Sequence, residues 1–174
     1  MSYLQSKKVV PFSLLLASSL LGLSLSTQAQ NQTDQDQNTA LQVVAKMTEG
    51  QRTYYQKNGQ FRAQVTNIQK DFGITLPPTF DYAVRTTSEA AYSYVIPSQS
   101  PVTNKLKAYV GAAFLTPNQN PKITTIICQN TTPGQVRPAD PQLVRLGTDL
   151  SSAAKLTLQC GDFSVEVPAS MLTE

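Results

Sequence analysis

The fold is decided by the stretch from FDYAVR (Phe80–Arg85) through YSYVI (Tyr92–Ile96) to LKAYVGAAF (Leu106–Phe114). Within each run the residues alternate in character, which is the period of a β-strand with two different faces. A fourth run, ITTIIC (Ile123–Cys128), is nearly continuous in apolar and β-branched residues, as expected for a central strand. Proline-rich breaks separate the runs, so we predict an antiparallel meander of about four strands.

The residues before these strands follow a helical period instead. Helical character starts near Asn38 or Thr39, either of which is a good N-cap, and Asn58-Gly59 is a typical stop. Residues 65–72 predict a further short helical turn. We therefore predict an α+β domain in which one N-terminal helix packs on the sheet.

The C-terminal part predicts a loop followed by a hairpin. Residues 130–149 include Pro133, Gly134, Pro138 and Pro141 and read as one long connection. Its section Thr131–Pro141 is our best candidate for a contact surface, because binding residues often lie on loops held by a rigid scaffold. Alternation returns after residue 155, and Gly161-Asp162 predicts the turn of a short C-terminal hairpin.

The first 29 residues have the organisation of a secretion signal. Two lysines precede an apolar run over residues 9–25, and small residues precede a possible cut between Ala29 and Gln30. The alternative is a membrane anchor that stays in place. We favour cleavage, because the run is shorter than the about 20 apolar residues of a spanning helix and is diluted by serine.

Cleavage at this position defines the domain organisation. Residues 1–29 are the signal peptide, the entirely polar residues 30–38 are a disordered leader, and residues 39–174 are a single domain. Removing residues 1–29 leaves 145 of the 174 residues and lowers the net charge from +3 to +1. A nearly neutral mature chain gives no reason to expect a nucleic acid as partner, and a membrane is expected only if the signal is kept.

The side chains available for catalysis are few. The sequence contains no histidine, which removes the serine, cysteine and zinc sites that are built on it. Glu49 and Glu89 stand in polar surroundings typical of a solvated face. We expect no enzyme activity, no cofactor and no metal. An enzyme of an unrecognised type would need a concave pocket with convergent polar groups.

The two cysteines, Cys128 and Cys160, lie 32 positions apart. This spacing does not fit a CxxC redox site, and the lack of histidine argues against a metal site. In an oxidising compartment such a pair tends to become a disulfide, so we predict a bond between them. Closing a loop of this size stabilises a fold by about 3–4 kcal/mol.

Four segments taken together carry a family resemblance. They are GQRTYYQKNGQF (Gly50–Phe61), YSYVIP (Tyr92–Pro97), LKAYVGAAF (Leu106–Phe114) and ITTIICQNTTPG (Ile123–Gly134), followed by prolines and Cys160. Their order and spacing resemble the type IV pilin-like G and H proteins of cyanobacteria. The resemblance implies a pilin-type domain, with a helix on an antiparallel sheet and a disulfide near the C-terminus. It also implies a role in surface filaments or related secretion systems.

The N-terminus departs from the pattern of pilins. These carry a short basic leader that is cut before a phenylalanine, with a glutamate soon after it. Here Phe12 follows Pro11, and no acidic residue precedes Asp34. The leading hypothesis is an exported, non-enzymatic pilin-like domain that acts through protein or surface interactions and is periplasmic, secreted or on the cell surface. The alternative is a membrane-anchored minor pilin or pseudopilin-like subunit, with pilus or secretion components as partners.

Overall fold

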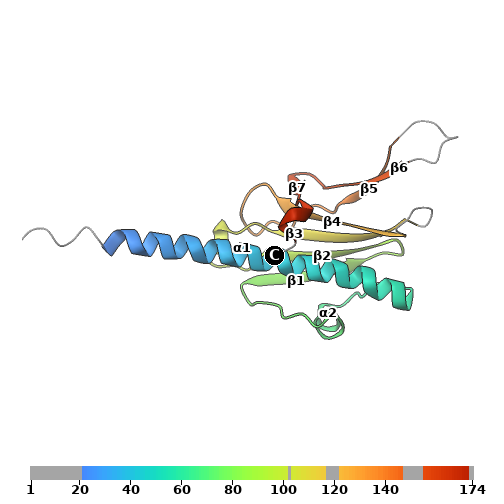
Figure 1. Cartoon of the computed structure of the whole chain (residues 1–174), viewed down its shortest axis with the longest axis horizontal. Helices are drawn as coiled ribbons and strands as arrows, with labels where there is room; N and C mark the ends of the chain where they lie inside the picture. Colours follow the sequence, from blue (N-terminus) through green and yellow to red (C-terminus); the bar gives the residue numbers. More distant parts are fainter. Residues whose placement is uncertain (1–20, 102, 117–121, 147–154, 173–174) are drawn as a thin grey trace, which may run out of the picture. The chain divides into compact units, whose positions relative to one another are not determined.

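The computed structural model describes residues 21–101, 103–116, 122–146 and 155–172 (Figure 1). The helices are α1 (Leu21–Asn58) and α2 (Val65–Phe72), with short 3-10 turns η1 (Thr103–Lys105) and η2 (Ala169–Met171). The strands are β1 (Phe80–Thr86), β2 (Ala90–Pro97), β3 (Tyr109–Leu115), β4 (Ile123–Asn130), β5 (Gln142–Leu146), β6 (Lys155–Gln159) and β7 (Ser164–Glu166). Within the described ranges, no helix is both long enough and apolar enough to cross a membrane.

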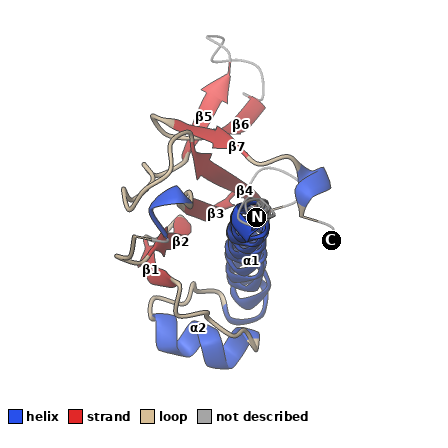
Figure 2. Cartoon of the chain, turned by 90° about the vertical axis from the view of Figure 1, so that its left-hand side faces the viewer, coloured by secondary structure: helices blue, strands red, loops and turns tan. Residues whose placement is uncertain are grey.

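The strands form two antiparallel sheets, which Figure 2 shows in red. The larger sheet has the order β1-β2-β3-β4-β7, and β5 pairs with β6 in a separate hairpin. The predicted α+β fold is therefore confirmed: a long N-terminal helix, an antiparallel sheet and a small C-terminal hairpin. The meander of four strands is the predicted one, and β7 adds a fifth strand beside β4.

The hairpin differs from the prediction in its position. A turn does exist at Gly161, where the Ser164 N–H donates to the Gly161 carbonyl over 3.3 Å. This turn connects β6 to β7, which belong to different sheets, so it is not a hairpin turn. The partner of β6 is β5, which lies inside residues 130–149, where we had expected only a loop. Alternation of apolar and polar residues predicts that a segment is a β-strand, but it does not indicate which other strand pairs with it.

α1 begins at Leu21, well before the expected start at Asn38 or Thr39. The structure places residues 30–38 inside this helix, whereas their composition predicted a disordered leader. No glycine or proline interrupts residues 23–49, so nothing in this stretch breaks the helix. Residues 1–20 of the predicted signal lie outside the described residues.

Two hydrogen bonds attach the polar part of α1 to the domain. The chain divides into two units, residues 1–32 and 33–174, and Gln37 belongs to the second. Its side-chain amide donates to the Lys107 carbonyl over 3.2 Å and accepts from the Lys107 N–H over 2.7 Å. A short polar helix has little stability of its own in water, so such tertiary bonds favour helix in this segment.

α1 packs closely on one face of the larger sheet. Val44 and Met47 are fully buried, and the sheet residues facing them include Gly111. A Cβ atom at Gly111 would lie 1.8 Å from Thr48 Oγ1, which is far inside van der Waals contact. Its partner across the strands, Ser93, is also small and fully buried. Small residues at this point of the sheet therefore allow the helix to approach.

A second glycine lets α2 pack against α1. A Cβ atom at Gly50 would lie 2.2 Å from Cδ2 of Phe72, the last residue of α2. The same ring lies 6.2 Å from the ring of Tyr54, measured between centroids. Glycine in a helix interior costs about 1 kcal/mol relative to alanine, and here the lost side chain makes room for Phe72. The predicted helical turn over residues 65–72 is thus a docked helix.

The substitution Gly111→Ala tests the close approach of α1. The added methyl group must displace Thr48 or the helix, so we expect the free energy of unfolding to fall by about 1–3 kcal/mol. Urea unfolding of the wild type and the variant gives this difference. The double variant Gly111→Ala/Thr48→Ala removes the nearest atom and should lose less stability than the two single variants added together. An unchanged stability of Gly111→Ala would contradict the close approach.

Candidate functional site

The face of the larger sheet that points away from α1 is also buried. Its buried residues are Ala90, Tyr92, Tyr94, Val110, Ala112, Phe114, Ile126 and Cys128. The covering residues include Leu143 and Leu158, which come from the part of the chain between the two cysteines. We call residues 129–159 the disulfide-closed segment. Of this segment, the structure describes residues 129–146 and 155–159.

The disulfide between Cys128 and Cys160 is present, as predicted. Cys128 is fully buried on β4, and the two Cα atoms are 5.7 Å apart. The bond joins the two ends of the disulfide-closed segment to each other. The segment therefore leaves the sheet and returns to it at the same place.

Asp140 ties the disulfide-closed segment to the sheet. Its carboxylate accepts hydrogen bonds from the Tyr94 hydroxyl and from the Arg85 guanidinium. The guanidinium of Arg137 lies 3.8 Å from the centroid of the Tyr94 ring, and that of Arg85 lies 4.3 Å from the centroid of the Tyr92 ring. Two charge-assisted hydrogen bonds thus end on the Asp140 carboxylate, and cation–π contacts hold the neighbouring arginines against the tyrosine rings. We call these five residues the Asp140 cluster.

A backbone hydrogen bond and a side-chain hydrogen bond fix the section Thr131–Pro141. The Gly134 N–H donates to the Leu106 carbonyl over 2.9 Å. The Asn130 side-chain amide donates to the Val136 carbonyl over 2.8 Å. The predicted contact loop is therefore an ordered surface attached to the sheet at several points.

Two large apolar side chains are exposed here, Val136 within this section and Phe163, whose carbonyl is bonded to Thr131. Val136 is 74% exposed and Phe163 is 86% exposed. Phe163 has a φ of 58°, in the left-handed region that bulky residues seldom adopt. Its carbonyl is held by the Thr131 N–H over 2.9 Å and by Thr131 Oγ1 over 3.1 Å. An exposed aromatic ring on a fixed, strained backbone is a frequent feature of binding surfaces.

No sequence pattern indicates the Asp140 cluster. Tyr94 and Asp140 are 46 positions apart, and Arg85 and Asp140 are 55 apart. Tyr92, Tyr94 and Tyr109 are buried. Tyr92 and Tyr94 lie on the face of the sheet that points away from α1.

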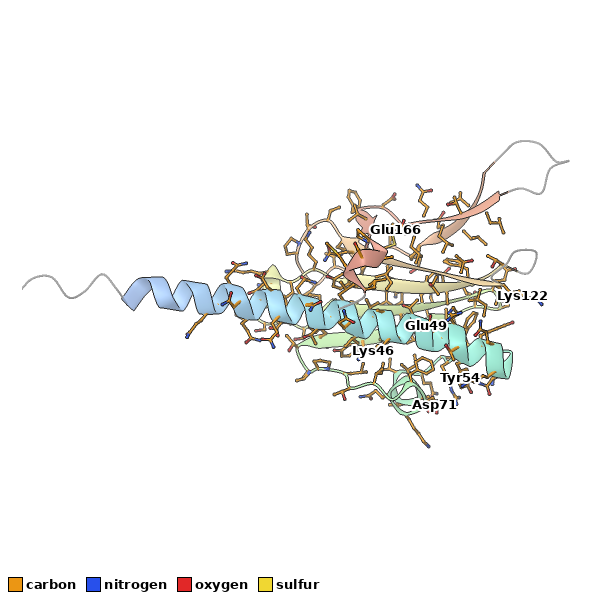
Figure 3. The ribbon with its side chains drawn as sticks, in the orientation of Figure 1. Lys46, Glu49, Tyr54, Asp71, Lys122 and Glu166 are labelled. Atoms are coloured by element: carbon orange, nitrogen blue, oxygen red, sulfur yellow. A yellow bond between two sulfur atoms is a disulfide. The ribbon has the colours of Figure 1, made fainter. Side chains whose placement is uncertain are left out.

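A groove of about 970 Å³ lies between α1 and residues of α2 and β4, and Figure 3 labels Lys46, Glu49, Tyr54 and Asp71 around it. Hydrogen bonds from Arg52 lower the pKa of Glu49, which is the wrong direction for a general acid at neutral pH. Asp71 forms an ion pair with Arg62. The polar groups of the groove thus pair with neighbours in a way typical of a solvated surface.

Glu49 and Glu89, the carboxylates considered as an acid/base pair, line different hollows. The structure therefore does not bring them together. In the described part of the chain, no group of three or more His, Cys, Asp or Glu side chains is placed to hold a metal ion.

Ala29 and Gln30, the residues on either side of the predicted cut, both lie in α1 with exposed side chains. Exposure is compatible with processing and does not test it. The cut between them stays a prediction.

The neutral form of Tyr94 stabilises the Asp140 cluster. Burial raises the pKa of Tyr94, and the hydrogen bond that it donates to Asp140 raises it further. The stabilisation is complete below the unfolded value near 10 and is lost as the pH rises through the higher folded value. The protein should therefore become less stable above about pH 10.

The substitution Tyr94→Phe tests this pH dependence. We expect the variant to lose about 1.5–3 kcal/mol near pH 7, because a hydrogen bond to a charged group is removed. Above about pH 10 its stability should fall less steeply than that of the wild type. Urea unfolding at fixed pH values measures both effects, and Tyr55→Phe on α1 is the control that should follow the wild-type curve. Equal alkaline slopes for wild type and Tyr94→Phe would contradict a neutral Tyr94 in the cluster.

Comparison with known proteins places this geometry in a family. Residues 37–160 match the family described as type IV pilin-like G and H. Searches against curated proteins and against solved structures gave no match. The matched range runs from Gln37 to Cys160. Gln37 is hydrogen-bonded to Lys107, two residues before β3, and Cys160 closes the disulfide. Because the match covers more than half of the chain, the chain belongs to the type IV pilin-like G and H family.

Proposed function

We propose that this chain is an exported, non-enzymatic domain that acts by binding other proteins, namely pilus or secretion components. The contact surface is formed by Thr131–Pro141 of the disulfide-closed segment together with Phe163, which is bonded to Thr131. The observation that carries the proposal is the exposed pair Val136 and Phe163 on an ordered surface of a pilin-like domain. The family is consistent with a pilus-related protein. The disulfide is typical of proteins outside the cytoplasm.

Export through a cleaved signal is part of the proposal. A cut after Ala29 would release the chain to the periplasm, the cell surface or the medium of its source, which we propose to be a cyanobacterium. The charged, apolar and small-residue order of residues 1–29 supports this step. A membrane is a partner only if the signal is kept.

The exposed pair is suited to binding because its backbone is already ordered. The Val136 carbonyl is bound by Asn130, and the Phe163 carbonyl is bound by Thr131, the next residue along the chain. Both apolar residues are thus attached to the end of β4. A surface that is rigid before binding loses less conformational entropy in a complex.

The alternative function is a membrane-held minor pilin whose first helix serves as anchor. It is favoured by the family and by the uninterrupted course of α1 from Leu21 to Asn58. Such a subunit would remain uncut, would be recovered with membranes and would co-purify with sheared filaments.

The double variant Val136→Ala/Phe163→Ala tests the proposed contact surface. In cells of the source organism, we expect cross-linking of the exported protein to pilus or secretion components to fall at least roughly tenfold, which corresponds to about 1.4 kcal/mol. The melting temperature should stay near that of the wild type, because both side chains are exposed. Met171→Ala, which truncates another exposed apolar side chain at 57% exposure, is the matched control.

Two results would count against the proposal. Cross-linking that is unchanged in the double variant would remove the disulfide-closed segment as the contact surface. Recovery of the uncut chain in membranes and sheared filaments, with reduced piliation on deletion, would instead support the membrane-held subunit.

A further inference from the structure

The cut proposed above makes Gln30 the first residue of the mature chain, and the present inference rests on that cut. An N-terminal glutamine carries an α-amine and, on the same residue, a side-chain amide at a distance that allows a five-membered ring. Asparagine has the same amide one methylene closer and would need a strained four-membered ring. The side chain of residue 30 therefore decides whether the new N-terminal amine can close a ring with it.

The position of Gln30 leaves this reaction sterically open. Its side chain is exposed. After a cut before Gln30, the first residues of the remaining helix have no preceding carbonyls to bind. Helix ends of this kind fray, so the amine can reach its own side chain.

The helix also favours an uncharged end. The N-terminus of a helix carries a partial positive charge, which disfavours an ammonium group there and favours acidic residues in the first turns. Asp34 and Asp36 lie in the first two turns of a helix that begins at Gln30. Removal of the ammonium charge would leave these two carboxylates as the charges nearest the helix start.

We propose that Gln30 is a modification site, at which the mature N-terminus cyclises to pyroglutamate. The α-amino nitrogen attacks Cδ of the Gln30 side chain, and a new Cδ–N bond forms. The Cδ–Nε2 bond breaks, and Nε2 leaves as ammonia with a proton from the amine. The step consumes no oxidant, reductant or other reactant. The product is a neutral lactam without a primary amine, so aminopeptidases cannot trim the exported chain.

Peptide mass spectrometry of the exported full-length protein tests this inference. The first peptide of the wild type should start at residue 30 and be lighter by one ammonia than the unmodified sequence. The variant Gln30→Asn keeps an exposed amide at the cut and should start at residue 30 with a free amine. Gln32→Ala, which alters a neighbouring glutamine, should be cyclised like the wild type.

The outcomes separate the inference from the proposed export. A wild-type chain that starts at Gln30 with a free amine overturns the cyclisation and leaves the cut in place. A chain that keeps residues 1–29, or starts at another residue, overturns both. A blocked α-amine in Gln30→Asn would also overturn the assignment, because the shorter side chain cannot form the same ring.

Discussion

The close approach of α1 to the sheet at Gly111 is the constraint on which the rest of the structure depends. α1 covers most of one face of the sheet, with α2 beside it, and Thr48 lies where a side chain at Gly111 would lie. The opposite face carries Tyr92 and Tyr94 and needs a cover of its own. No helix of the described chain supplies that cover, so it comes from the disulfide-closed segment.

The disulfide-closed segment therefore covers the sheet, which is its structural role, and is also part of the proposed binding surface. Its inner side covers the sheet, and Asp140 and the disulfide hold it there. Its outer side is consequently ordered before any partner binds. A surface fixed in this way can display Val136, together with Phe163 just beyond the segment, at a low cost in conformational entropy.

The sequence predicted the elements that depend on local patterns. The strand periods predicted β1 to β4, and Gly59 and Gly73, both with positive φ, marked the ends of two helices. The features that it missed depend on distant partners: β7 on β4, β5 on β6, and Tyr94 on Asp140. The helical state of residues 30–38 was missed for the same reason, because composition does not show the bonds between Gln37 and Lys107.

Amide hydrogen exchange of the native, oxidised protein tests the central claim most directly. If the disulfide-closed segment is an ordered layer, the amides of Gly134 and of β5 should be protected, since Gly134 donates to Leu106 and β5 pairs with β6. The amides of β3 serve as the internal reference for the sheet. Exchange of Gly134 and β5 at the rate of an unfolded peptide, while β3 stays protected, would contradict the account.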